Sequence, residues 1–294
     1  MKIILSRKGF DSTAGGIASP IMPDGRLLSL PIPITENQRI GGEQGIRYQD
    51  LEFDGQPLDQ IIGQLRFRCR DPFPYGEAHL DPDLDPGRFV RRRRDWEPSF
   101  GQTGRPQGHL RNQHVDAGDL FLFYGWFKRA ELENGEWHYV RHAPDLHVIF
   151  GWLHVGERLR VNQGEAGNRI PYHPHIRNTD LYGDDNTIYV ARDRLNLNGR
   201  DSAIAGAGIF AQFNDALRLT APDEHRRSYW RLPRWFYPFG NRPRTPLTCH
   251  ENPRKWTLNG DHVILESAYP GQEFVFDTGE YPEAVGWVRS LFQP

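Results

Sequence analysis

The chain has 294 residues and a formal net charge of -2, so it is long enough for one large domain or two ordinary ones and is not globally basic. Its hydrophobic content of 37%, with 30 Gly and 23 Pro, favours a loop-rich protein with β-structure over a helical bundle. Short apolar runs and two distant cysteines, Cys69 and Cys249, argue against a membrane span, a signal peptide and a disulfide framework, so we expect a cytoplasmic location.

The first sixteen residues combine a short strand with a polar, glycine-rich loop. We expect a buried strand at Ile3-Ile4-Leu5, and the loop beyond it contains Arg7, Lys8, Asp11, Ser12, Gly15 and Gly16. Glycines let backbone N–H groups approach a ligand, and neighbouring cations favour an anion such as phosphate. Asp11 could serve as a base, as a nucleophile or as a partner for developing positive charge. The alternative is a surface turn in which Asp11 only caps the loop.

The following hundred residues predict few regular elements. Residues 21–30 predict a strand, a Pro-Asp-Gly turn and a second strand. Residues 57–65 predict a short helix whose apolar face holds Leu58, Ile61, Ile62 and Leu65. Residues 71–113 predict an irregular insertion that is too long for an ordinary connection, and it is therefore functional or mobile.

The insertion contains the run Arg91-Arg92-Arg93-Arg94, the strongest local concentration of cations in a chain with 32 Arg and four Lys. Arginine forms bidentate contacts with phosphate, and such clusters often mark nucleic-acid surfaces. We therefore predict that these four side chains contact a nucleic-acid backbone. A solvated loop without a partner is the alternative.

The centre of the chain is rich in predicted β-structure. Strands are expected at 119–127, 137–140, 147–155 and 186–191, with a hairpin turn at 133–136. The stretches GDLFLFYGWF and HVIFGWLHVGE resemble the paired central strands of PUA-like small barrels, which often hold nucleic acid or a flipped base. That resemblance implies an aromatic cage around a base, with walls formed by Tyr124, Trp126 and Trp152.

The last third of the chain contains an aromatic segment and a closing helix. Residues 228–239 hold six aromatic residues beside arginines, which form either a segment of the core or a stacking platform for bases. Residues 201–213 have mixed periodicity and stay unassigned. Residues 281–292 predict a helix whose apolar face holds Ala284, Val285, Val288 and Leu291. The whole pattern predicts an α+β fold with a β-rich core, a mixed or barrel-like sheet and few short helices.

The histidines allow one metal hypothesis. His79-Leu80-Asp81 is an H-x-D triplet, the first half of the iron site of two-histidine, one-carboxylate oxygenases, and His154, His173 or His175 could complete it. Such triplets are common by chance, and no second ligand pair has a spacing typical of zinc. We therefore assign no metal ligand, expect no cofactor and place His173 and His175 among the substrate-binding residues. Neither a P-loop nor a G-x-S-x-G motif occurs, which disfavours those two enzyme classes.

Several stretches resemble one known family. SRKGFDSTAGG with SPIMPDGRLLSLPIP, the central GDLFLFYGWF and IFGWLHVGE, and the later HPH with NTIYVA are similar to the third of the nucleotide-modification-associated domain families. The similarity runs along nearly the whole chain, so we treat residues 1–294 as one domain with an insertion. The resemblance implies a protein that acts on, or recognises, modified nucleobases, in connection with phage DNA-hypermodification and restriction-type systems.

Our first functional hypothesis is a DNA glycosylase of bacterial antiviral defence, a hydrolase that flips a hypermodified base out of DNA and cleaves its glycosidic bond. Base chemistry within a duplex requires extrusion of the base into a pocket. Asp11 would stabilise the oxocarbenium-like transition state, while the glycine-rich loop and the arginine run would hold the substrate and its backbone. Two alternatives stay open: a PUA-like reader that binds modified bases without chemistry, and an Fe(II) oxygenase or other base-modifying enzyme that uses His79 and Asp81.

Overall fold

The computed structural model describes the whole chain except residues 67–72, 74, 75, 88, 93, 198, 268–272 and 294. The predicted contribution of Arg93 to a backbone contact, and the position of Cys69, lie outside the described residues. No helix within the described part of the chain is long and apolar enough to cross a membrane.

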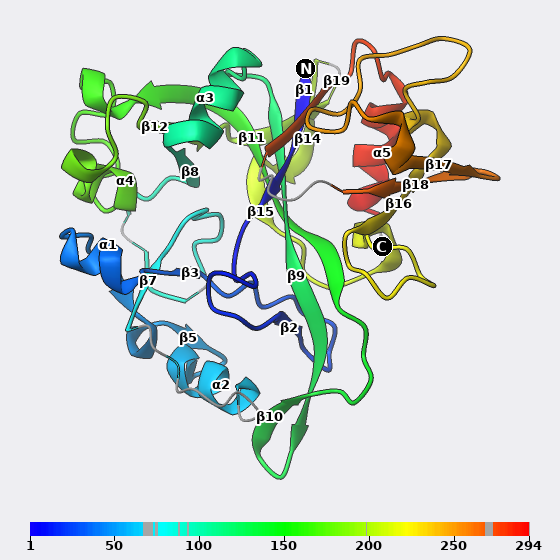
Figure 1. Ribbon diagram of the computed structural model, residues 1–294. Coiled ribbons are helices and arrows are strands. Elements are labelled where there is room, and N and C mark those ends of the chain that lie inside the picture. The colour runs from blue at the N-terminus through cyan, green and yellow to red at the C-terminus, as the bar shows by residue number, and fades with distance from the viewer. Residues whose placement is uncertain are drawn as a thin grey trace.

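A nine-stranded sheet of mixed direction forms the centre of the molecule (Figure 1). The first strand, Lys2–Arg7, pairs antiparallel with Glu273–Asp277, the last described strand, and parallel with Leu120–Glu133. The main path follows the order β19 (Glu273–Asp277), β1 (Lys2–Arg7), β9 (Leu120–Glu133), β11 (Leu146–Arg160), β12 (Thr187–Ala191) and β8 (Ser99–Gln102). Three further strands pair outside this path. Strands β2 (Ser19–Ile21) and β10 (Glu136–Tyr139) pair with β9, and β15 (Ala207–Ile209) pairs with β11. The described strands form a mixed sheet and no closed barrel, so the barrel-like alternative is wrong and the mixed-sheet prediction is confirmed.

Four small sheets surround the central one. They are β3 (Ile32–Pro33), β7 (Glu77–His79) and β4 (Ile46–Arg47); β5 (Glu52–Phe53) and β6 (Gln56–Pro57); β13 (Arg194–Leu197) and β14 (Arg200–Ala205); and β16 (Tyr229–Pro233), β18 (His262–Glu266) and β17 (Trp256–Asn259). The described α-helices are short: α1 (Glu36–Ile40), α2 (Leu58–Leu65), α3 (Gly104–Asn112), α4 (Pro174–Arg177) and α5 (Glu283–Leu291). Single 3₁₀ turns are η1 (Tyr48–Asp50), η2 (Val161–Gln163), η3 (Thr179–Leu181), η4 (Asp215–Leu217), η5 (Arg234–Phe236) and η6 (Pro253–Lys255).

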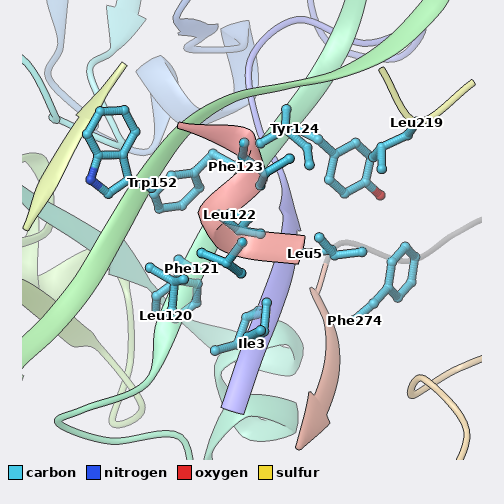
Figure 2. Close-up of a cluster of buried hydrophobic side chains, with 14 of the residues drawn as sticks. Ile3, Leu5, Leu120, Phe121, Leu122, Phe123, Tyr124, Trp152, Leu219 and Phe274 are labelled. Atoms are coloured by element: carbon cyan, nitrogen blue, oxygen red, sulfur yellow. The ribbon is translucent and has the colours of Figure 1, made fainter. Parts of the chain in front are cut away.

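The main hydrophobic core covers both faces of the central sheet. Figure 2 shows Ile3 and Leu5 of β1 beside consecutive residues of β9 and Phe274 of β19. Residues 120–124 are all buried, although neighbouring side chains of a strand point to opposite faces. A strand with two covered faces reads as a continuous apolar run rather than an alternating one, which is the pattern seen in LFLFY. The central part of β9 is therefore covered on both faces of the sheet.

Two helices and the central strands agree with their predictions. Helix α2 buries Leu58, Ile61, Ile62 and Leu65, and α5 buries Ala284, Val285, Val288 and Leu291. The strong apolar runs at 119–127, 147–155 and 186–191 lie in β9, β11 and β12. Within 228–239, Trp230 and Phe236 are buried in the main core, which confirms that this segment is part of the core.

The insertion at 71–113 is more regular than predicted. It contains β7, β8 and α3. Helix α3 has the sequence GRPQGHLRN and buries only Gln107 and Leu110, so it lacks the repeated apolar face that signals a helix.

The strand, turn and second strand predicted at 21–30 are only partly correct. Beyond β2 a single bridge joins Ile21 to Leu27, and the N–H of Leu30 donates to the Ser19 hydroxyl instead of to a neighbouring strand. Residues 201–213, left unassigned, contribute to β14 and β15.

Candidate metal centre

Two histidines and an aspartate from distant parts of the chain meet at one margin of the sheet. His79 is the last residue of β7, Asp81 follows it, and His175 belongs to α4. Figure 1 shows β7, β8, α1 and α4 gathered on the same side of the molecule. One ligand-type atom from each of the three residues lies within 4.8 Å of the other two. We call His79, Asp81 and His175 the candidate metal cluster.

The cluster converges on one carboxylate oxygen. Asp81 Oδ2 lies 3.8 Å from His79 Nε2 and 3.6 Å from His175 Nε2. Protein ligands sit about 2.1 Å from a divalent transition-metal ion, so two ligands of one ion are roughly 3.0–3.4 Å apart. The two distances to Asp81 Oδ2 exceed this range by only a few tenths of an ångström, and the ligand atoms of the two histidines lie within 4.8 Å of each other. Side-chain movements would bring all three ligands onto one ion.

The second nitrogen of each cluster histidine faces an acceptor oxygen. His79 Nδ1 lies 2.9 Å from Glu43 Oε1, and His175 Nδ1 lies 2.6 Å from Asn186 Oδ1. An ionised carboxylate and an amide oxygen only accept hydrogen bonds, so each Nδ1 carries a proton. The Nε2 atoms are then the ones suited to bind an ion at Asp81. Metal-binding histidines are usually held in this way, with one nitrogen on the ion and the other donating to the protein.

Asp81 is held through its other oxygen. Asp81 Oδ1 accepts a hydrogen bond from the Gly101 N–H at 2.9 Å and lies 3.6 Å from His173 Nε2. His173 Nδ1 accepts from the His175 N–H and caps α4, so Nε2 is the nitrogen that can donate toward Asp81. That Nε2 is buried and makes no hydrogen bond to any described residue. The Gly101 N–H therefore engages Asp81 Oδ1, whereas Asp81 Oδ2 faces the Nε2 atoms of His79 and His175.

The electrostatics of the cluster favour a cation. Asp81 and Glu43 are buried carboxylates with 6% and 3% of their side chains exposed. Burial alone would raise the pKa of Asp81, but His173, His79 and His175 around it outweigh burial and hold that pKa far below its usual range. Burial would lower the pKa of His79, but Asp81 and Glu43 raise it to about 9. Burial lowers the pKa of His175 to about 3. Protonated His79 balances one of these two buried anions, and a metal ion that displaces its Nε2 proton would compensate both carboxylates.

Glycine is required at position 101. Strand β8 passes directly beneath the ring of His175, and a Cβ atom on Gly101 would lie 2.3 Å from His175 Cδ2. Any larger residue would push the imidazole away from Asp81. Gly101 therefore acts twice, since its N–H also binds Asp81 Oδ1.

Four predicted residues, from the end of β1, the loop after it and β9, are joined by contacts that do not involve the cluster. Asp11 Oδ1 accepts hydrogen bonds from Thr13 N, Thr13 Oγ1 and Ala14 N at 2.7–2.8 Å, and Asp11 Oδ2 lies 3.8 Å from Arg7. Ser12 Oγ accepts from Arg227, whose guanidinium lies 4.3 Å from the ring centre of Trp126. Gly15 and Gly16 turn the loop with positive φ, as their residue type allows. The structure thus brings Arg7, Asp11, Ser12 and Trp126 together.

Other predicted residues are buried. Lys8 Nζ donates to Glu273 Oε1 at 3.0 Å and lies over the Phe100 ring. Tyr124 is 1% exposed and packs against Trp230 and Phe274, and burial raises its pKa. His154, one of the histidines considered for an iron site, lies apart from the cluster, with Nε2 near the carbonyl of Gly118.

The arginine run divides among different environments. Arg91 and Arg94 are exposed, Arg92 forms an ion pair with Asp83, and Arg93 is outside the described residues.

Sequence reasoning did not find Glu43, Asn186 or Gly101. None of the three belongs to a motif with the cluster residues, and they lie 36, 11 and 20 positions from the groups that they contact. The available signals were the H-x-D triplet at His79 and the HPH at His173, which the fold brings together.

One family model matches the chain. It is described as nucleotide modification associated domain 3, and it covers residues 2–277. No curated protein and no solved structure matches the chain.

Proposed function

The chain belongs to the nucleotide modification associated domain 3 family, and we propose that it is an enzyme that modifies nucleobases with a metal ion bound by His79, Asp81 and His175. The family supports a role in nucleotide modification. The observation that carries the metal-dependent reaction is the convergence of two Nε2 atoms and one carboxylate oxygen, each with its remaining polar atom bound by the protein.

The donor set favours iron(II). Two histidines and one carboxylate on one side of an ion are typical of non-heme iron oxygenases, in which open coordination positions are offered to substrate and dioxygen. We propose oxidation of a C–H group of the base. One atom of dioxygen bonds to that carbon, the other leaves as water, and an organic co-reductant supplies two electrons with two protons. In this chain, Glu43 and Asn186 hold the imidazoles, and Gly101 holds Asp81.

The glycosylase hypothesis places the reaction at Asp11 instead. One oxygen of that carboxylate accepts three hydrogen bonds from its own loop, and the other faces Arg7. These contacts support the capping role that the sequence left open. The metal cluster is the better candidate because its Nε2 atoms and Asp81 Oδ2 have no such local task.

The reader hypothesis depends on an aromatic cage. Of its three proposed walls, Tyr124 and Trp152 are 1% and 8% exposed, and the half-buried Trp126 lies under Arg227. This arrangement gives little open aromatic surface to a base, so it favours an enzyme. DNA with modified bases as the substrate, extrusion of the base and a part in phage defence stay predictions that rest on the family.

Metal analysis tests the proposal directly. Protein purified without chelator and reconstituted with Fe(II) under nitrogen should bind one ion per chain, and His175→Ala should bind none. The control is His225→Ala, which removes an exposed histidine outside the cluster. With phage DNA and a co-reductant, wild type and control should consume dioxygen and yield an oxidised base. Wild-type protein that binds no divalent ion, or equal activity of His175→Ala, would overturn the proposal.

A further inference from the structure

We propose a second site, a pocket beside the metal cluster that binds a single nucleotide through its base and its phosphate. The cavity has a volume of about 300 Å³, at the small end of the range of ligand pockets. Its walls come from the segment between α1 and β4, from β7 and the residues just beyond it, from Val90, Arg91, Arg92 and Trp96, and from α4 with the residues before it. We call it the arginine–tryptophan pocket. The choice of a nucleotide rests on the family role under the proposed function, while the pocket itself does not depend on the metal.

The base-binding part is apolar and aromatic. Ile46, Ala78, Leu80, Val90 and Pro174 line the pocket together with two aromatic residues, Trp96 and Tyr172. Both aromatic side chains are fixed by hydrogen bonds: Trp96 Nε1 donates to Asp83 Oδ2 at 2.8 Å, and Tyr172 OH accepts from the Glu97 N–H at 2.7 Å. Rigid aromatic rings beside aliphatic side chains are the surfaces on which unstacked bases bind.

The charges of the pocket favour a phosphate. Three arginines, Arg91, Arg92 and Arg177, line it against one carboxylate, that of Asp83. Arg91 and Arg177 are exposed, so they can meet an anion at the pocket mouth. Arg92 is largely buried and pairs with Asp83 through one terminal nitrogen, but its Nε is buried without a hydrogen-bond partner among the described residues. A buried guanidinium N–H without an acceptor destabilises the protein, because it has lost its hydrogen bonds to water. A phosphate oxygen of a ligand could accept a hydrogen bond from Arg92 Nε and remove that penalty.

The pocket and the metal cluster share their supporting segments. Ala78 and Leu80 line the pocket, whereas His79 and Asp81, which alternate with them, belong to the cluster. Pro174 lines the pocket between His173 and His175 of α4. A nucleotide bound here would therefore lie against the backbone that carries the metal ligands. The ligand chemistry is that of a nucleoside monophosphate, present either as a free nucleotide or as an extruded unit of a DNA strand.

Binding measurements on the full chain test this site. Calorimetric titrations would compare thymidine 5′-monophosphate, thymidine, inorganic phosphate and a short single-stranded oligonucleotide. We expect the monophosphate to bind more tightly than thymidine or phosphate, and Arg177→Gln and Trp96→Ala to weaken it at least tenfold. Arg39→Gln, an exposed arginine of α1 outside the pocket, is the matched control. Arg177 is exposed, so its variant stays informative if Trp96→Ala does not fold.

The possible outcomes distinguish a free nucleotide from a unit of a DNA strand. They also distinguish failure of the pocket proposal from failure of the metal proposal. Tighter binding of the oligonucleotide, with the same loss in Arg177→Gln, would identify a unit of a DNA strand. Binding of the monophosphate alone would identify a free nucleotide. The titrations use metal-free wild-type protein, so failure of the metal proposal leaves this test intact. Undetectable binding of every nucleotide ligand, equal affinity for inorganic phosphate, or wild-type affinity in Arg177→Gln would overturn the site.

Discussion

His79 Nδ1 lies 2.9 Å from Glu43 Oε1, although 36 positions separate the two residues in the chain. The same oxygen accepts a hydrogen bond from the Tyr182 hydroxyl at 2.6 Å. The buried carboxylate thus fixes the ring of His79 from the side opposite Asp81. A carboxylate behind a histidine both orients the ring and makes its second nitrogen a better ligand.

We predict that Glu43→Gln weakens metal binding without abolishing it. The amide can still accept a hydrogen bond from His79, but it lacks the negative charge that increases the basicity of the imidazole. Loss of such outer partners typically reduces metal affinity by about 10–100-fold. Competition titration with a chelator would measure the change, with Glu36→Gln on the exposed side of α1 as control. Equal affinities of Glu43→Gln and wild type would contradict the role given to Glu43.

Periodicity predicted those parts of the fold in which neighbouring residues carry the information. Helices α2 and α5 have complete apolar faces, and β9 has an uninterrupted apolar run, so local sequence determines each of them. Helix α3 buries only two residues and escaped prediction. The site follows the same rule: the H-x-D triplet of His79 is local and visible, whereas Glu43, Asn186 and Gly101 reach the cluster only through tertiary packing.

Gly101→Ala should remove the metal and leave the fold in place. The added methyl group would lie 2.3 Å from the His175 ring, which must then move away from Asp81. Circular dichroism should show native secondary structure, while the bound iron falls well below one ion per chain. Gly63→Ala in α2, where no described atom lies within 4 Å of the added Cβ, is the control. A fully metallated Gly101→Ala protein would show that the ring position is not critical.

Lys8→Met should destabilise the protein through Glu273. The two side chains are 7% and 1% exposed, and 3.0 Å separates Nζ from Oε1. Removing the cation leaves a buried carboxylate without its charged partner, although Gln102 Nε2 still donates to Glu273 Oε1, and such a loss typically costs about 3–5 kcal/mol. Denaturant unfolding would measure the loss, and the double variant Lys8→Met/Glu273→Gln should recover part of it. Unchanged stability of Lys8→Met would contradict the stabilising role given to the buried pair.

Acid should destabilise the fold through His147. Its ring is buried, Nδ1 accepts a hydrogen bond from Trp230 Nε1 at 2.9 Å, and burial, with smaller effects of Arg227 and Arg7, lowers its pKa to about 3. An unfolded histidine titrates near 6.5, so between about pH 6.5 and pH 3 the unfolded chain binds more protons than the folded one. The contribution of this neutral ring to stability is complete above that window and is lost as pH falls through it.

His147→Gln should reduce that pH dependence. The glutamine oxygen can accept from Trp230 but does not titrate, so the slope of unfolding free energy between pH 4 and 6 should fall by up to about 1.4 kcal/mol per pH unit. Urea unfolding at several pH values would measure both slopes, and His225→Ala provides a control at an exposed histidine. Parallel curves for His147→Gln and wild type would contradict the assignment.

Asp11→Asn distinguishes the metal-dependent enzyme from the glycosylase. Asparagine keeps a carbonyl oxygen that can accept the hydrogen bonds of Thr13 and Ala14, so the loop should persist while its negative charge disappears. We expect base oxidation by Asp11→Asn to equal that of the wild type, and neither protein should produce abasic sites in phage DNA that carries hypermodified bases. The assay reads alkali-labile breaks and released base, with unmodified DNA as the control substrate. Breaks confined to modified DNA, formed by the wild type and lost in Asp11→Asn, would move the reaction centre from His79, Asp81 and His175 to the first loop.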